Sequence, residues 1–216
     1  MKSDSIILFP SAFLLSLPYF AYPSLITKVL PIYFLALFPL IPGASARFNV
    51  VSIGLLLSSV GDIALQLGDD GLYFIGGLAF FLMAHVAYII FFYHSNLQIS
   101  SFAIFCIFAV TLLYILLPNI GSDLKLPVIV YALVIATMGG MSLSRFWLNK
   151  GSDYLTSLYG VLGAGIFLIS DTILALNKFY SPFSGAQTFV MITYYIGQTL
   201  IAASNHTAVK TSKMKA

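Results

Sequence analysis

The chain is dominated by apolar runs about as long as a membrane is thick, separated by short segments rich in turn-forming residues. A helix that crosses the hydrocarbon core of a bilayer needs about 20 mostly apolar residues. Only 8% of the residues are charged, whereas a soluble domain typically carries about 25%. Helices satisfy their own backbone hydrogen bonds in lipid. We therefore expect an all-α, polytopic integral membrane protein.

The apolar runs and the turn signals between them predict about eight transmembrane helices, in one domain that covers residues 1–216. Six of the nine prolines precede residue 43, so we expect the first two spans to be kinked or shortened. The last run is polar for a span, which favours a position among other helices. The predicted spans are 5–22, 26–42, 48–67, 72–93, 100–117, 125–147, 154–176 and 184–205.

The distribution of basic residues predicts the orientation, because loops on the cytoplasmic side carry an excess of Lys and Arg. With both termini placed in the cytoplasm, the inner segments hold Lys2, Arg47, Arg145, Lys150, Lys210, Lys213 and Lys215. The outer loops then hold Lys28, Lys125 and Lys178. Both termini are therefore expected in the cytoplasm, and the short loops favour a bacterial inner membrane.

Several function classes find no support in the composition. The basic residues are scattered and form no nucleic-acid patch, although the net charge is +3. The single cysteine, Cys106, lies in an apolar run and offers no disulfide framework. No metal-ligand spacing, phosphate loop or nucleophile elbow is present. We therefore expect no nucleic-acid partner, no metal and no cofactor.

Two aspartates lie inside predicted spans, whereas the other five acidic residues, all aspartates, lie in the N-terminal tail or in connections. Asp62 lies in "GDIALQL" and Asp171 in "SDTILAL", each five residues before the end of its span. Both spans run outward, so both carboxyl groups are expected about 7–8 Å below the outer edge. A charge at membrane depth is costly, which makes both residues candidates for function. A structural hydrogen bond between helices is the alternative.

The positions of the two aspartates also suggest an internal duplication. A shift of 109 residues places Asp62 on Asp171 and Gly54 on Gly163. The repeat halves would be 1–109 and 110–216, each with four spans of the same topology and with a site between them. We treat the duplication as a hypothesis.

Other polar side chains occur at helical spacing around the two aspartates. His85 is the only histidine deep inside a predicted span, with Tyr88 on the same helix face. Each of these residues also has a structural alternative, as a hydrogen-bonding group between helices. The candidates for a supporting role are Ser58, His85, Tyr88, Ser170, Tyr194 and Gln198.

Two carboxyl groups brought close together in a dry pocket cannot both ionise, so they would share one proton. The protonated group is then a general acid, and the ionised group is a general base that activates water. This pair suits hydrolysis of a bond that breaks on protonation. It would equally suit a proton relay in a transporter.

Five segments together resemble the YhhN-type lysoplasmalogenase family. They are "SSVGDIALQL" (58–67), "FIGGLAFFLMAHVAYIIFFY" (74–93), "LPVIVYALVIATM" (126–138), "GAGIFLISDTILALNKF" (163–179) and "TYYIGQTLIAAS" (193–204). The combination of G-D, H-x-x-Y, S-D and Y-Y-x-x-Q in this order is specific, although each piece alone is weak. The resemblance covers roughly residues 50–205, and the first two spans match only loosely.

The resemblance implies an eight-span enzyme that hydrolyses the vinyl ether of lysoplasmalogens. Its products would be a fatty aldehyde and glycerophosphocholine or glycerophosphoethanolamine, and its partners the lysophospholipid substrate and membrane lipid. The active-site pair of the family would correspond to Asp62 and Asp171. Tyr131 and Asn177 lie in the matching segments and join the supporting candidates.

Two other functions compete with the hydrolase. An intramembrane aspartyl protease also uses paired aspartates, but Ser59 stands where the G-x-G-D motif has glycine, and no P-A-L motif follows. A proton-coupled transporter would suit a two-half architecture. In that case only His85 and the two aspartates form a candidate relay, with no embedded basic residue to extend it.

Overall fold

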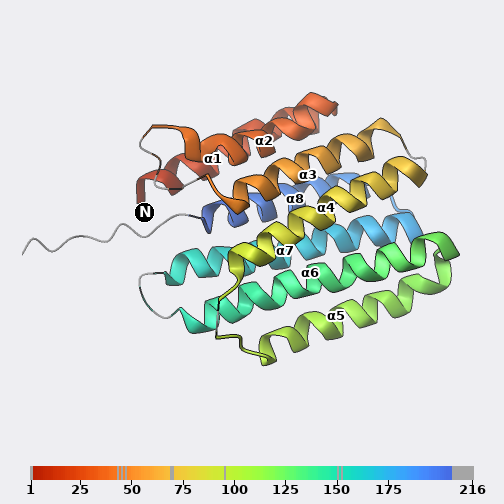
Figure 1. The fold of residues 1–216 in the computed structure, drawn as a ribbon. Helices are drawn as coiled ribbons and strands as arrows, with labels where there is room; N and C mark the ends of the chain where they lie inside the picture. The colour runs from red at the N-terminus through yellow and green to blue at the C-terminus, as the bar shows by residue number, and fades with distance from the viewer. Residues whose placement is uncertain are drawn as a thin grey trace, which may run out of the picture.

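Eight α-helices lie side by side in the computed structural model, which describes residues 2–205 except positions 43, 45, 47, 69, 70, 95, 150 and 152 (Figure 1). The helices are α1 (Lys2–Ala21), α2 (Leu25–Leu37), α3 (Val50–Leu67), α4 (Gly71–Phe92), α5 (Ser100–Leu116), α6 (Ser122–Leu148), α7 (Tyr154–Phe179) and α8 (Ala186–Ala203). Two 3₁₀ turns, η1 (Phe38–Leu40) and η2 (Leu117–Asn119), extend α2 and α5. Each predicted segment forms one helix, and the all-α class is confirmed.

Five of the helices in the described part of the chain are long and apolar enough to cross a membrane: α3, α4, α5 with its 3₁₀ extension, α6 and α7. Two shorter apolar segments precede them, Ile7–Ala21 within the described part of α1 and Leu25–Leu40, which joins α2 to its 3₁₀ turn. The α-helical part of α2 ends at Leu37, and the 3₁₀ turn that follows contains Pro39. The chain is an integral membrane protein.

The start of α2 is fixed by a capping box. The Ser24 hydroxyl accepts a hydrogen bond from the Thr27 amide at 3.2 Å, and the Thr27 hydroxyl accepts one from the Ser24 amide at 3.0 Å. The helix therefore begins at Leu25, and Lys28 lies in its first turn with only 4% of its surface exposed. The prediction that Lys28 belongs to an outer loop is wrong.

Helices that follow one another in the chain run in opposite directions, and α3 with α4 and α7 with α8 pack most closely (Figure 1). α6 contacts both α4 and α7, and α1 and α2 cover α3 and α8 from one side (Figure 1). α5 lies at the opposite edge, packed on α6 and only weakly on α7. A core of buried aliphatic and aromatic side chains from α1 to α4 and α6 to α8 joins the bundle.

Close approach of α7 and α8 depends on Gly163. A methyl group at this position would meet the Ile201 amide nitrogen at 2.9 Å and the Gly197 carbonyl oxygen at 3.0 Å, both backbone atoms that cannot rotate away. We expect Gly163→Ala to destabilise the protein by about 1–3 kcal/mol, as overpacking does. Thermal unfolding in detergent measures the effect.

Gly165 is the matched control, because a methyl group there would meet no atom within 4 Å. Gly165→Ala should be neutral or stabilising by up to about 1 kcal/mol, since alanine favours helix more than glycine does. Equal stability of the two variants would contradict the packing of α7 against α8.

Candidate active site

A cavity of about 580 Å³ opens within the bundle, and all eight helices contribute to its lining. Asp62 of α3 and Asp171 of α7 both line it. Gly61 lets α3 approach α4 closely beside Asp62, since a methyl group at this position would lie 2.7 Å from a ring carbon of Phe81 and 3.2 Å from the Gly77 carbonyl oxygen. The two carboxyl groups therefore face one space, although 109 residues separate them in the chain.

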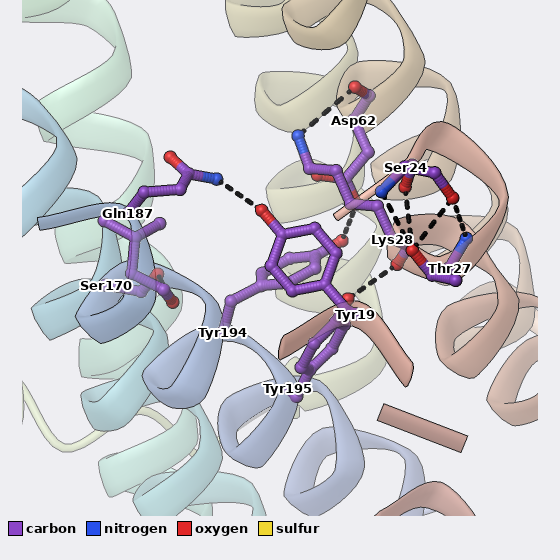
Figure 2. Close-up of polar contacts among 10 residues, drawn as sticks. Tyr19, Ser24, Thr27, Lys28, Asp62, Ser170, Gln187, Tyr194 and Tyr195 are labelled. Carbon is purple, nitrogen blue, oxygen red and sulfur yellow. Dashed lines mark hydrogen bonds and ion pairs between the residues drawn. The ribbon is translucent and has the colours of Figure 1, made fainter. Parts of the chain in front are cut away.

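Asp62 is buried, and both of its carboxyl oxygens have partners (Figure 2). The Lys28 ammonium nitrogen lies 3.3 Å from Oδ1. The Tyr194 hydroxyl donates a hydrogen bond to Oδ2 at 2.6 Å. α2 and α8 thus supply a cation and a hydroxyl to one carboxyl group on α3.

Lys28 is held in place by two backbone contacts. Its ammonium group donates to the Asp62 carbonyl oxygen at 3.4 Å. Its own carbonyl oxygen accepts a hydrogen bond from the Tyr195 hydroxyl at 2.9 Å (Figure 2). Lys28 and Asp62 thus form a buried ion pair fixed from α8, and the expectation that no basic residue is embedded is wrong.

Asp171 has different surroundings. Its Oδ2 accepts a hydrogen bond from the Tyr131 hydroxyl at 2.5 Å, and His85 Nε2 lies 3.4 Å from the same oxygen. His85 Nε2 is also 2.8 Å from the Tyr131 hydroxyl oxygen. The three side chains come from α4, α6 and α7 and form a hydrogen-bonded chain that ends at the carboxyl group.

No hydrogen bond joins Asp62 to Asp171 among the residues that the structure describes. Each carboxyl group has its own set of donors, and both carboxyl groups line the same cavity. A substrate or a water molecule in this cavity can therefore approach both. The arrangement can present an acid and a base to one molecule from two sides.

The remaining predicted residues are divided between the cavity and the packed interior. Tyr88 donates a hydrogen bond to Gln198 Oε1 at 2.8 Å, and Ser58 is fully buried; none of these three lines the cavity. Ser170 and Asn177 line it, but both bind backbone. The Ser170 hydroxyl donates to the Val190 carbonyl at 3.0 Å, and Asn177 Oδ1 accepts from the Phe183 amide at 3.1 Å.

The cavity lining contains polar groups that the sequence did not single out. Lys28 is the most important, and the capping box at Ser24 was the signal that places it inside a helix. Tyr19 and Gln187 also line the cavity and bind each other, with 3.0 Å between the Gln187 amide nitrogen and the Tyr19 hydroxyl (Figure 2). No local sequence signal pairs two residues so far apart in the chain.

Comparison with known proteins identifies the family. The model of the YhhN family matches residues 24–205. The chain belongs to the YhhN family. That match includes both embedded aspartates and extends to Lys28, beyond the part of the chain in which motifs were recognised.

Several curated proteins similar to this YhhN family member have lysoplasmalogenase in their names. Human "Lysoplasmalogenase TMEM86A" is 33% identical over 189 residues, which cover 85% of this chain and 78% of the human protein. "Lysoplasmalogenase TMEM86B" of Sus scrofa is 33% identical, over 83% of this chain and 74% of that protein. A "Lysoplasmalogenase homolog" of Dictyostelium discoideum is 27% identical, over 71% and 62%. No solved structure matches the chain significantly.

The side chains around the two carboxyl groups decide what this YhhN family site can bind. Among the described residues, no group of three or more His, Cys, Asp or Glu side chains is arranged to hold a metal ion. The neighbours of the two carboxyl groups are instead donors: an ammonium and a phenol at Asp62, and a phenol and an imidazole at Asp171. Such neighbours are suited to controlling protons.

Proposed function

We propose that the protein is a lysoplasmalogenase. It hydrolyses the vinyl ether of a lysoplasmalogen that carries choline or ethanolamine, and it releases a fatty aldehyde and glycerophosphocholine or glycerophosphoethanolamine. The observation that carries this proposal is the membrane-embedded cavity with two carboxyl groups held by separate donor sets. The name shared by relatives about one third identical over most of the chain supports the same substrate class.

The chemistry of a vinyl ether explains why two carboxyl groups suit this reaction. The bond is cleaved after a proton is added to the outer vinyl carbon, which leaves an oxocarbenium ion. Water then adds to the cationic carbon, and the resulting hemiacetal breaks down to the aldehyde and the glycerol hydroxyl. An aspartic acid supplies the proton, while a carboxylate stabilises the cation and activates the water.

The cavity lining fits an amphiphilic substrate. Charged and amide side chains come from α2, α3, α7 and α8, whereas the residues contributed by α5 are all apolar. We place the vinyl ether between Asp62 and Asp171 and the alkyl chain along α5. α5 packs only weakly against α7. We therefore propose that the alkyl chain of the substrate enters the cavity from the bilayer between these two helices.

The full architecture is part of the proposal. We infer that all eight helices cross the membrane, including the shorter or more polar α1, α2 and α8, and that both termini are cytoplasmic. The internal duplication is supported by packing, because α3–α4 and α7–α8, which correspond in the two halves, are the two closest helix pairs.

Release of aldehyde tests the activity. The purified full-length protein in detergent is supplied with a lysoplasmalogen, and the fatty aldehyde is quantified. Wild type should release aldehyde, and Asp62→Asn and Asp171→Asn should release it far more slowly. Asp123→Asn is the matched control, because Asp123 is an exposed aspartate in the first turn of α6. Absence of aldehyde with folded wild-type protein would refute the proposed function.

A substitution on α5 tests the placement of the alkyl chain. Ala109 lines the cavity, so Ala109→Phe should fill part of the space used by the chain. We expect kcat/KM for a long-chain substrate to fall roughly tenfold, with a smaller loss for a short-chain one. Val110→Phe is the control, because Val110 is 63% exposed and does not line the cavity. An equal fall in kcat/KM for the long-chain and the short-chain substrate would show that the alkyl chain binds elsewhere.

A further inference from the structure

The two carboxyl groups differ in how many of their oxygens have partners. Both oxygens of Asp62 are engaged, one by Lys28 and one by Tyr194. Asp171 engages only Oδ2, and its Oδ1 has no hydrogen-bond partner within the described part of the chain. The Asp171 side chain is also 16% exposed, against 4% for that of Asp62. Asp171 is therefore the group with an oxygen left for the substrate.

We propose that the two aspartates have fixed and different roles: Lys28 holds Asp62 as the carboxylate, and Asp171 is the acid that protonates the outer vinyl carbon from Oδ1. This assignment rests on the proposed function for its reaction. The charge states that it assigns are argued from the contacts of the two carboxyl groups alone.

Lys28 determines the state of Asp62. Both side chains are almost completely removed from solvent, and a buried ammonium without an anion is strongly destabilising. Lys28 also donates to the Asp62 carbonyl, and Tyr194 donates to Oδ2, so every contact at Asp62 presents a hydrogen to it. A carboxylate can accept all of these hydrogen bonds. A carboxylic acid would add a hydroxyl hydrogen of its own, and the groups around Asp62 are donors that do not offer it an acceptor.

The chain of His85, Tyr131 and Asp171 leaves a place for the acidic proton. The Tyr131 hydroxyl has one hydrogen, which it donates to Asp171 Oδ2. His85 Nε2 must then carry a hydrogen, which it donates to the Tyr131 oxygen. Because Oδ2 of Asp171 accepts the hydrogen of Tyr131, the acidic proton of Asp171 is placed on its other oxygen, Oδ1. His85 and Tyr131 are positioning residues that also stabilise the carboxylate left after proton transfer.

The assignment gives a balanced reaction cycle. The Oδ1–H bond of Asp171 breaks as a C–H bond forms at the outer vinyl carbon, which leaves a carboxylate and an oxocarbenium ion. The Asp62 carboxylate takes a proton from water as the water oxygen bonds to the cationic carbon. Protonated Asp62 then gives this proton to the departing glycerol oxygen. Asp171 takes the hydroxyl proton of the hemiacetal, so the aldehyde forms and both aspartates return to their starting states.

Infrared spectroscopy of the substrate-free, full-length protein tests the charge states directly. A protonated carboxylic acid has a C=O stretching band distinct from those of a carboxylate. We expect one such band from the cavity, lost in Asp171→Asn and kept in Asp62→Asn and in the control Asp123→Asn. A band lost in Asp62→Asn and kept in Asp171→Asn, or no such band in wild type, would overturn the assignment.

Variants that keep both carboxyl groups provide a second measurement. Tyr131→Phe removes the donor to Asp171 Oδ2 and should shift the band, whereas Tyr194→Phe removes a donor to Asp62 and should leave the band unchanged. Lys28→Met should add a second acid band from Asp62, and Lys28→Arg should not. A band that responds to Tyr194→Phe and not to Tyr131→Phe would contradict the assignment.

The aldehyde assay separates this inference from the proposed function. If wild type releases aldehyde and the acid band belongs to Asp62, only the assignment of roles fails. If the band belongs to Asp171 and no aldehyde is released, the charge states stand and the proposed reaction fails.

Discussion

Replacement of Asp171 by asparagine is expected to lower the rate of aldehyde release by a factor of about 10²–10⁴, the usual contribution of a general acid. The amide has nearly the same shape and can still accept the Tyr131 hydrogen bond from its oxygen. It has no acidic proton to give to the vinyl carbon. The loss should therefore fall on kcat, while KM stays close to the wild-type value.

Steady-state kinetics in detergent measure this effect. Asp123→Asn is the matched comparison, because it makes the same chemical change at an exposed aspartate in the first turn of α6. It should retain most of the activity. A kcat for Asp171→Asn close to that of wild type would exclude Asp171 as the acid.

Removal of the buried cation is expected to have the second large effect. Lys28→Met takes the counter-ion away from buried Asp62, which must then take up a proton to remain buried, and breaking a buried pair in this way costs about 3–5 kcal/mol. The additional change Asp62→Asn replaces the carboxyl group that has lost its counter-ion with a neutral amide. The double variant should therefore be more stable than Lys28→Met alone, although one more native residue has been replaced.

Thermal unfolding in detergent, with aldehyde release measured in parallel, checks this expectation. Stability should return in the double variant, and activity should not, because Asp62 has lost its carboxylate. Lys125→Met is the control for the loss of a lysine, since Lys125 is exposed in α6. Additive losses of stability in the double variant would show that Lys28 and Asp62 do not depend on each other.

Much of the fold could be predicted because its determinants are local. Apolar runs of membrane length and the turn residues between them predicted all eight helices to within a few residues. Asp62 and Asp171 could be recognised because a charged residue stands out within such a run. Membrane crossing by α1, α2 and α8 stays a prediction, because these helices are shorter or more polar than the other five.

The partners of the site residues could not be predicted, because they depend on how distant helices pack. Helical spacing paired His85 with Tyr88, but His85 contacts Tyr131 and Asp171, whereas Tyr88 binds Gln198. Lys28 was assigned to a loop because it lies near the start of a short span. Its role depends on the contact between α2 and α3, for which the sequence contains no local signal.

The origin of the hydrogens in the product tests protonation of the vinyl carbon most directly. The enzyme is supplied with a lysoplasmalogen in ²H₂O, the aldehyde is reduced to the alcohol as it forms, and the alcohol is analysed by mass spectrometry. A single deuterium on the carbon next to the former carbonyl carbon is expected, beyond the exchange seen when the same aldehyde is incubated with Asp171→Asn protein. Aldehyde released without deuterium at that carbon would show that the ether is broken by another route.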